Sequence, residues 1–437
     1  MSASTTVAAA QPAWLLPPPE ASFAGQPDNL TALRRSAWEQ FTETGLPNTR
    51  REAWRHTNLD PLKQFAFRPQ AGDVPVSAEA LAPYRLDGEI GAVCVNGTFR
   101  PDLSNLANLP EGAVLESLAA AIGRGALEQL QAFEFDQDQP AEGLSMAWLQ
   151  DGIYLQVPQG VVIEQPLHFY FVSTGNDDST VSFPRVHIQS GDNCQLALVE
   201  HHIGLGSQPR LTCSVTRIEV GPGAVVEYLR LLEEGAGAHH LASITARQQA
   251  GSQLQMTGLS TGGDLQRNDV TAALEGEGAS HRMAGLYLVR GREQVDNHTR
   301  IDHMAPHTSS VETYKGILDG QGRGIFTGRI VVHPAGQQTD ARQTNRNLML
   351  SDQALVHTDP QLEIFADDVK CSHGSTVGQV DDEAMFYIRS RGIGMAEAHR
   401  LLVHGFSAEV LEQISHPLLR AVATEQVNRW LEELPAP

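Results

Sequence analysis

The fold is decided by the stretch Gly191-Asp-Asn-Cys-Gln-Leu-Ala-Leu198, in which a turn leads directly into a strand-like run. The same order returns in Gly221-Pro-Gly-Ala-Val-Val-Glu-Tyr228, Gly251-Ser-Gln-Leu-Gln-Met256 and Gly278-Ala-Ser-His-Arg-Met283, so the turns lie 30, 30 and 27 residues apart. A turn and a strand repeated at such a period indicate a solenoid, whose coils are stable only when they are stacked. We therefore expect a parallel β-helix, with a β-sandwich built from long hairpins as the alternative.

Helical patterns flank this β region on both sides. Across residues 144–380, short runs of Val, Ile, Leu and Thr alternate with polar residues and glycine, and no helical period persists. Residues 28–143 indicate a mixed, mostly helical domain that includes a hairpin turn at Asn96-Gly97, and residues 381–437 indicate a C-terminal helical domain. Residues 1–27 are rich in Ala, Pro and Ser, and we expect them to be disordered or draped over the surface. The predicted fold is mainly β, with a parallel β-helix core between two helical domains.

Composition and missing motifs disfavour several classes of function. The chain has 437 residues with 31 basic and 52 acidic side chains, and its net charge of −21 repels nucleic acid and anionic membrane surfaces. Phe, Trp and Tyr contribute only 14, 5 and 7 residues, which leaves few aromatic platforms for a carbohydrate groove. The motifs G-x-x-x-x-G-K-[ST], G-x-S-x-G and H-E-x-x-H are missing, so we expect neither phosphoryl transfer nor hydrolysis by this chain alone.

The cysteines indicate a reducing compartment. Cys94, Cys194, Cys213 and Cys371 are far apart and form no C-x-x-C pair, which argues against a disulfide framework, a zinc ribbon and a cluster held by the chain's own cysteines. The first basic residue is Arg34, so the beginning of the sequence lacks the positive region of a secretory signal. We expect a cytoplasmic protein.

The tract with the most distinctive chemistry is Phe365-Ala-Asp-Asp-Val-Lys-Cys-Ser-His-Gly374. On a strand, Cys371 and His373 project from the same face, and their Cα atoms lie roughly 6.5 Å apart. A thiolate and an imidazole at that spacing are able to bind one metal ion or cluster, but two ligands are too few, so further donors must come from another chain. Residue frequencies alone favour the alternative, a small buried cysteine beside a hydrogen-bonded histidine.

Other polar clusters carry weaker signals. His303 and His307 have the i,i+4 spacing of helical metal ligands, but Pro306 and the β context oppose a helix, and on a strand the two lie about 13 Å apart. We therefore interpret them as polar side chains in tight turns. The pairs Asp367-Asp368 and Asp381-Asp382 carry the ligand type that divalent cations prefer, yet a solvated face or a helix cap is the favoured interpretation.

Several motifs together resemble the SufB/SufD family of iron–sulfur cluster assembly proteins. The matching segments are Asp302-His-Met-Ala-Pro-His307, Tyr314-Lys-Gly316, Gly324-Ile-Phe-Thr-Gly-Arg329, Thr339-Asp-Ala-Arg-Gln343, Asn347-Leu-Met-Leu350, Pro360-Gln-Leu-Glu-Ile364 and Asp367-Asp-Val-Lys-Cys-Ser-His-Gly374. The Lys-Cys-Ser-His-Gly form is similar to the SufD branch of the family, as are Gly45-Leu-Pro47 and Arg51-Glu-Ala-Trp54 near the N-terminus. The resemblance extends from about residue 30 to residue 432.

The resemblance implies a right-handed β-helix and a scaffold rather than an enzyme. Such a scaffold acts with SufB and the SufC ATPase to build nascent iron–sulfur clusters, and has a role in iron acquisition. It further implies that His373 lies at the SufB interface near a SufB cysteine, with Cys371 in the neighbouring position. The cluster or iron is then transient and shared with SufB, and none is tightly bound to this chain alone.

The resemblance also implies that the C-terminal helical domain binds SufC. Candidate contacts are Leu401, Leu402, Phe406 and Val410, although burial in the domain's own core is the alternative for most of them. In isolation, the chain is expected to be able to form a homodimer. Two other hypotheses are an inert structural adaptor for SufB and SufC, and a β-helix enzyme acting on polysaccharides.

Overall fold

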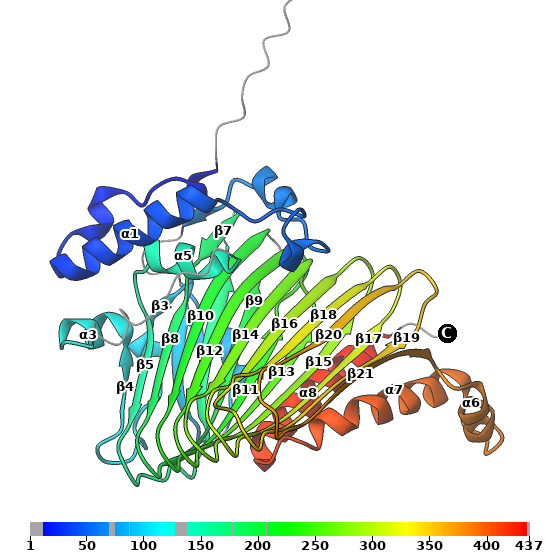
Figure 1. Ribbon diagram of the computed structural model, residues 1–437. Helices are drawn as coiled ribbons and strands as arrows, with labels where there is room; N and C mark the ends of the chain where they lie inside the picture. The colour runs from blue at the N-terminus through cyan, green and yellow to red at the C-terminus, as the bar shows by residue number, and fades with distance from the viewer. Residues whose placement is uncertain are drawn as a thin grey trace, which may run out of the picture.

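The computed structural model describes residues 12–69, 75–86, 88–126, 138–175, 179–206 and 208–434. Two large sheets, A and B, form the walls of a solenoid that runs through the middle of the molecule (Figure 1). Helical segments from the two ends of the chain lie against the outside of these walls.

Sheet A has eleven strands, of which nine follow the order β20-β18-β16-β14-β12-β10-β8-β5-β4. Its strands are β1 (Arg68–Pro69), β4 (Val114–Ser117), β5 (Gly152–Val157), β7 (Thr180–Ser182), β8 (Arg185–Ser190), β10 (Arg210–Val220), β12 (Ala238–Gln248), β14 (Leu265–Leu274), β16 (Gln294–His303), β18 (Arg323–Val332) and β20 (Leu355–Ile364).

Sheet B has ten strands in the order β21-β19-β17-β15-β13-β11-β9-β6-β2-β3. Its strands are β2 (Ile90–Val95), β3 (Thr98–Phe99), β6 (Leu167–Thr174), β9 (Gln195–Leu205), β11 (Val225–Glu233), β13 (Gln253–Thr261), β15 (Ser280–Val289), β17 (Ser309–Leu318), β19 (Asp340–Met349) and β21 (Lys370–Gln379).

From β8 onward the chain alternates between the two sheets, so each pair of consecutive strands makes one coil. The coils from β8–β9 to β20–β21 number seven, and each strand pairs in parallel with the strand one coil away. Parallel pairing confirms the predicted β-helix and is incompatible with the hairpins of a β-sandwich.

The repeated turns join the sheet A strand of each coil to its sheet B strand. In the first six of the seven coils this turn has one residue at positive φ, and these residues are Asn193, Gly223, Gly251, Gly278, His307 and Gln338, with φ between 52° and 71°. Their N–H groups donate to carbonyls of the next coil, as in Gly251 to Glu277 at 2.9 Å and Gly278 to Pro306 at 3.2 Å. The turn is therefore a repeated hydrogen-bonded column, and glycine takes its positive-φ position at Gly223, Gly251 and Gly278. Gly191 and Gly221 of the sequence repeat are not at positive φ, and a Cβ atom on either would collide with the backbone of the preceding turn.

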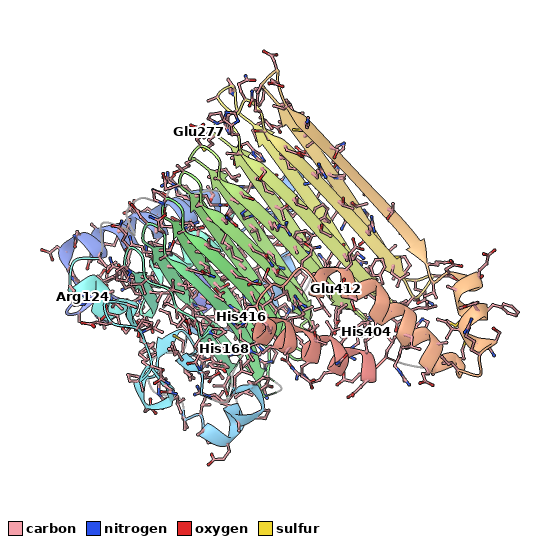
Figure 2. The ribbon with its side chains drawn as sticks, turned by 90° about the horizontal axis from the view of Figure 1, so that it is seen from below. Arg124, His168, Glu277, His404, Glu412 and His416 are labelled. Carbon is pink, nitrogen blue, oxygen red and sulfur yellow. The ribbon has the colours of Figure 1, made fainter. Side chains whose placement is uncertain are left out.

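Three apolar clusters stabilise the solenoid. One fills its interior, with side chains from both sheets such as Leu198, Val226 and Phe326. The N-terminal segment covers the outer face of sheet A, and the C-terminal helices cover the outer face of sheet B. In Figure 2, the labelled residues His404 and His416 mark the two C-terminal helices that lie across the strands.

Among the described residues, the helices lie before β5 and after β21. They are α1 (Asp28–Thr44), α2 (Ala78–Leu81), α3 (Leu118–Gly123), α5 (Pro140–Ala147), α6 (Asp382–Arg389), α7 (Met395–Leu411) and α8 (Pro417–Glu432). Short 3₁₀ turns occur at Ala13–Leu15, Glu20–Phe23, Glu52–Trp54, Asp60–Gln64, Ala82–Tyr84 and Pro101–Leu103. No helix in the described part of the chain is long and apolar enough to cross a membrane.

The described part of the tail, which was expected to be disordered or draped over the surface, is anchored to the rest of the molecule. Residues 1–11 lie outside the described residues, but Trp14 is fully buried and packs edge-on against Phe67 at 6.2 Å. The buried Arg34 guanidinium donates to Ser22 O at 2.9 Å and to Gln26 Oε1 at 2.8 Å, which fixes residues 20–26 to α1. The composition, rich in Ala and Pro, did not reveal these two anchors.

The N-terminal unit, residues 28–143, also contributes strands to the solenoid. The hairpin at Asn96-Gly97 is present, with both residues at positive φ, and it joins β2 to β3. However, β2 pairs in parallel with β6, and β4 pairs with β5, so both sheets begin before residue 144. At the other end, β21 ends at Gln379 and α6 begins at Asp382.

Candidate functional site

The last coil leaves one end of the solenoid open. Within the described residues, no strand pairs with the outer edge of β20 or of β21, each of which is ten residues long. The side chains of β21 are largely exposed and those of β20 are exposed or half-buried, whereas every second side chain of the preceding strand β19 is buried. The interior of the solenoid therefore reaches solvent at this end.

Cys371 and His373 lie on β21, with their side chains on the face that continues the interior. Cys371 is in register with Ala341, and His373 is in register with Gln343, and both neighbours are buried inside the solenoid. Cys371 is half-buried, while His373 is exposed because no further coil covers it. The pair therefore sits at the mouth of the interior, on an unpaired edge.

Ionisation of Cys371 needs a positive partner. Burial raises the pKa of its thiol, a hydrogen bond with the backbone at Ala341 offsets part of this rise, and the nearby Asp340 carboxylate adds a smaller rise. A thiol of this kind becomes a thiolate when a metal ion displaces its proton. No group of three or more His, Cys, Asp or Glu side chains in the described ranges is placed to hold a metal ion. Cys371 and His373 are thus two donors of an incomplete site.

The other three cysteines are structural. Cys94, Cys194 and Cys213 are buried in the apolar clusters, and burial raises the pKa of each thiol. Cys371 is the half-buried one of the four, and all four are free. Inert buried thiols of this kind contribute packing rather than reactivity.

The histidines of the second tract have structural roles, as predicted. His303 is fully buried, and its ring nitrogens lie 2.8 Å from Thr308 Oγ1 and 2.9 Å from Ser310 Oγ. His307 is an exposed turn residue with φ of 58°. Asp381 caps α6, because its Oδ1 accepts the backbone N–H of Glu383 at 2.8 Å.

Polar side chains line the interior directly behind the open end. The amides Gln343, Asn345 and Asn347 are buried on the inner face of β19, as an amide ladder between coils requires. Gln343 Nε2 donates to Glu312 Oε2 at 2.7 Å, and Asn345 Nδ2 donates to Tyr314 O at 3.3 Å. These amides join neighbouring coils.

Glu312 is a site residue that sequence reasoning missed. Its side chain is buried inside the solenoid, and burial raises the pKa of its carboxyl to about 7, with the Gln343 amide and the Thr299 hydroxyl opposing the rise only in part. The spacing between Glu312 and Gln343 equals one coil, since the two are in register on β17 and β19. A spacing of one coil in the sequence is therefore the signal from which the position of the Glu312 carboxyl, one coil before Gln343, could have been predicted.

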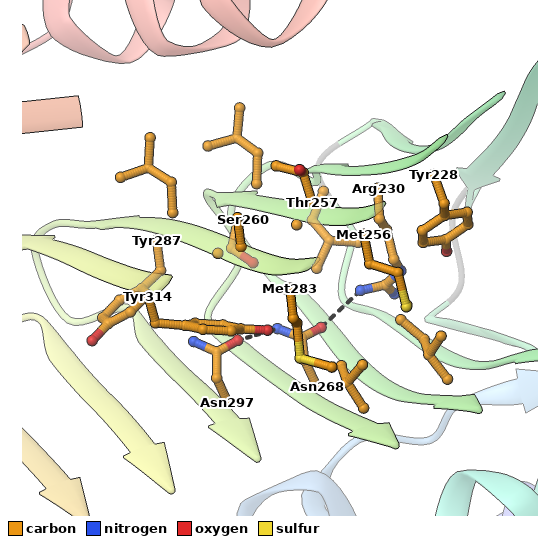
Figure 3. Close-up of a pocket in the computed structure, with 18 residues that line it drawn as sticks. Tyr228, Arg230, Met256, Thr257, Ser260, Asn268, Met283, Tyr287, Asn297 and Tyr314 are labelled. Atoms are coloured by element: carbon orange, nitrogen blue, oxygen red, sulfur yellow. Dashed lines mark hydrogen bonds between the residues drawn. The ribbon is translucent and has the colours of Figure 1, made fainter. Parts of the chain in front are cut away.

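Deeper in the interior, a chain of polar groups surrounds a small cavity (Figure 3). Arg230 donates to Asn268 Oδ1 at 2.8 Å, and Asn268 Nδ2 donates to Asn297 Oδ1 at 3.0 Å. The cavity of about 30 Å³ lies beside Gly258, where a Cβ atom would meet no other atom within 4 Å. It is large enough to hold water.

The buried charges around Arg230 are balanced by partners. Glu200 accepts from Arg230 Nε at 3.3 Å and from Tyr228 OH at 2.8 Å, and lies 2.8 Å from His202 Nε2. Burial alone would raise the pKa of Glu200, but the contacts with His202 and Arg230 lower it to about 2. This cluster is a compensated structural network rather than a reactive site.

The four candidate contacts on α7 lie in different environments. Val410 is 1% exposed and belongs to the cluster under the C-terminal helices, Leu402 and Phe406 are half-buried, and Leu401 is 48% exposed. Buried Lys315 of β17 donates to Phe406 O at 3.0 Å and pairs with Glu409, which fixes α7 to sheet B. Leu401 is therefore the one of the four that is open to a partner, and Val410 is a core residue.

Two exposed aromatic residues on α6 were missed by the sequence analysis. Phe386 is 76% exposed and Tyr387 is 58% exposed, on a helix that projects beyond the last strands (Figure 1). Met395 at the start of α7 is 42% exposed. We call Phe386, Tyr387, Met395 and Leu401 the C-terminal apolar surface. Exposed apolar groups of this size are typical of protein interaction sites.

Comparison with known proteins gives consistent matches along most of the chain. A family model described as "SUF system FeS cluster assembly, SufBD core domain" matches residues 171–406. A second model, described as "SufBD protein N-terminal region", matches residues 22–169. Together they cover the N-terminal unit, the solenoid and the beginning of the C-terminal helices.

Curated relatives agree with these models. The iron-sulfur cluster assembly protein SufD of Escherichia coli (strain K12) is 30% identical over 396 residues, which cover 90% of this chain and 91% of that protein. The iron-sulfur cluster assembly SufBD family protein slr0076 of Synechocystis is 29% identical over 408 residues, covering 90% of both chains. A chloroplastic relative from Arabidopsis thaliana, protein ABCI7, is 26% identical over 411 residues, covering 92% of this chain and 86% of that protein.

Proposed function

Because the chain belongs to the SufBD family of iron–sulfur cluster assembly proteins and is a homologue of SufD, we propose that its open end holds a nascent cluster together with a second chain. One observation carries this proposal. Cys371 and His373 form an incomplete donor pair on an unpaired strand edge, so a partner that extends the sheet also brings the missing ligands.

The partner proposed for this edge is a SufB-like chain. A ten-residue strand with free backbone N–H and C=O groups is a template for strand addition, which gives affinity through main-chain hydrogen bonds. In the absence of that partner, a second copy of this chain is able to pair with the same edge as a homodimer. The cluster or iron is the cargo of this site, shared across the interface and released to other proteins.

The chemistry of the two donors suits iron and sulfide. Thiolate and imidazole are ligands that iron–sulfur centres accept. A proton leaves Cys371 when iron binds, because burial keeps its thiol protonated otherwise. A neutral imidazole, unlike a thiol, binds a metal ion without releasing a proton.

The ATPase partner is proposed to bind the C-terminal apolar surface. This chain has no phosphate-binding loop in its sequence, so ATP hydrolysis belongs to a SufC-like subunit. The helix α6, which carries the exposed Phe386 and Tyr387, lies beyond the last strands near the open end (Figure 1), where a bound ATPase is close to the partner interface. The cytoplasmic location expected from the cysteines stays a prediction.

The central test compares cluster content in the reconstituted complex. His373→Ala is expected to lower iron and acid-labile sulfide strongly, and Cys371→Ala less, because thiolate is also available from the partner. Ser372→Ala is the matched control, since Ser372 lies on the same strand and points to the opposite face. The melting temperature of each variant is measured in parallel, and a change in the free energy of unfolding within about 0.5–3 kcal/mol is expected for His373→Ala.

Normal cluster content in His373→Ala would contradict the ligand role and favour the inert adaptor. The same conclusion follows if its cluster content falls only in proportion to a collapsed melting temperature. Family membership leaves this adaptor as the remaining alternative to a cluster-holding scaffold.

Binding of the ATPase is tested with point variants rather than by truncation. Removal of α7 and α8 would expose the apolar outer face of sheet B, so loss of binding in a truncated chain would have two explanations. Phe386→Ala with Tyr387→Ala leaves that core intact and is expected to abolish association with the ATPase in a pull-down. Leu418→Ala is the control, because Leu418 is 48% exposed on α8, outside the proposed surface. Retained association of the double variant would refute this assignment.

A further inference from the structure

Three side chains follow one another along the inner face of sheet B at the open end. Glu312 of β17 is in register with Gln343 of β19, which is in register with His373 of β21. Neighbouring strands in a sheet lie about 4.8 Å apart, so each side chain is adjacent to the next along the solenoid axis. The buried carboxyl, the amide and the proposed ligand therefore form one column, the Glu312 column.

The middle member of this column is firmly held on one side and unpaired on the other. Gln343 is 2% exposed, and its Nε2 donates to Glu312 Oε2 at 2.7 Å. A Cβ atom placed on Gly328 of the opposite sheet would lie 2.3 Å from Gln343 Nε2, so the amide is wedged against that glycine. Its oxygen Oε1 is buried and has no hydrogen-bond partner among the described residues.

The direction of the free oxygen follows from amide geometry. The nitrogen and oxygen of an amide diverge from the same carbon, so an amide whose nitrogen points to Glu312 turns its oxygen away from Glu312. The side of Gln343 opposite Glu312 is the side of β21, where His373 lies. A buried acceptor without a partner costs about 1–3 kcal/mol, so a donor that reaches it is strongly favoured.

We propose that Gln343 is a positioning residue for His373, accepting one ring N–H of the imidazole through Oε1 when a partner chain closes the open end. Closure removes the water that now reaches His373, and the ring N–H then finds its nearest buried acceptor in Gln343. Metal-binding histidines are usually supported in this manner, since a hydrogen bond from one ring nitrogen fixes the tautomer and leaves the other nitrogen free for the metal. This inference rests on the proposed function, because it assigns a support to the ligand proposed there.

The test measures the tautomer of His373 in the assembled complex. This chain is labelled with ¹⁵N-histidine, the resonances of His373 are assigned by their loss in His373→Ala, and the ring ¹⁵N shifts report which nitrogen carries the proton. A single tautomer is expected in the wild type, and a mixture like that of an exposed histidine is expected in Gln343→Met. Asn345→Leu is the matched control, because it removes a buried amide from the adjacent column, which is in register with Ser375 rather than His373.

A second variant protects the test against a folding failure. Glu312→Leu leaves Gln343 in place but removes the acceptor that holds its amide, so it is also expected to give a mixture of tautomers. With Co²⁺ as the probe metal, both variants are expected to bind about 10- to 100-fold more weakly than the wild-type complex, while Asn345→Leu binds normally.

The two proposals fail in different ways. Normal cluster content in His373→Ala overturns the ligand role, but the tautomer of His373 is measured without metal and still reports on Gln343. An unchanged tautomer in both Gln343→Met and Glu312→Leu overturns the positioning role, even if His373 proves to be a ligand.

Discussion

Replacement of Glu312 by Gln should make the protein more stable at high pH. The carboxyl of Glu312 is buried in the solenoid interior, which raises its pKa from 4.5 to about 7. Its hydrogen bond from Gln343 Nε2, at 2.7 Å, survives the change because the new side chain keeps an acceptor oxygen. The substitution therefore removes the ionisable group with little change in shape or bonding.

The sign of the effect follows from the protons bound in each state. Between pH 4.5 and about 7 the native protein keeps a proton on Glu312 that the unfolded chain has released, so the free energy of unfolding falls as the pH rises through this window. Summed to pH 8, the loss is about 3 kcal/mol, and at pH 5 it is about 1 kcal/mol. Glu312→Gln has no ionisable group at this position and does not lose this stability. The difference in the free energy of unfolding between the variant and the wild type should therefore grow by about 2 kcal/mol from pH 5 to pH 8.

The assay is urea unfolding of both proteins at pH 5 and pH 8, with thermal melting as a second probe. Glu277→Gln serves as the control, because Glu277 is an exposed carboxyl in a turn at the edge of the solenoid (Figure 2). An equal stability difference at both pH values would show that Glu312 is ionised in the folded protein, and would refute the reasoning.

Two further pairs of variants test the packing. Gly285→Ala would place a Cβ atom 2.2 Å from the Tyr314 ring, so its free energy of unfolding should fall by about 1–3 kcal/mol, whereas Gly258→Ala faces open space and should not destabilise the protein in the same unfolding assay. Val410→Ala should lower the free energy of unfolding by about 2 kcal/mol, because Val410 is buried between α7 and sheet B. Leu401→Ala should change stability by no more than about 0.5 kcal/mol and instead weaken association with the ATPase in a pull-down, and the reverse result for either residue would contradict the assignment of α7.

The period of the turns predicted the solenoid because the turns of the first six coils each need a residue that tolerates positive φ. Gly251 and Gly278 carry this signal plainly, and the same position is taken by His307 and Gln338 in later coils, where the sequence gives no warning. The repeat was therefore visible in the middle of the chain and hidden toward its end, although the backbone is the same.

Strand alternation predicted which side chains share a face, but not which faces are covered. Gln343 and His373 occupy the same register position, yet the first is 2% exposed and the second is exposed because β21 has no neighbour beyond it. Whether a side chain is buried depends on whether another coil packs over its strand, so burial could not be predicted from the sequence of a single strand. The same reason explains why Val410 and Leu401, both apolar residues of α7, have opposite environments.

The unpaired edge of β21 also makes the site sensitive to the register of any strand that pairs with it. Side chains on a strand alternate between two faces, so a partner strand displaced by one residue turns every one of its donors away from Cys371 and His373. A displacement of two residues restores the face but moves each donor by about 7 Å, beyond the reach of a shared metal. Assembly of the site therefore requires one register between the partner strand and β21. A partner must carry the right ligands and must also place them at the right positions along its strand.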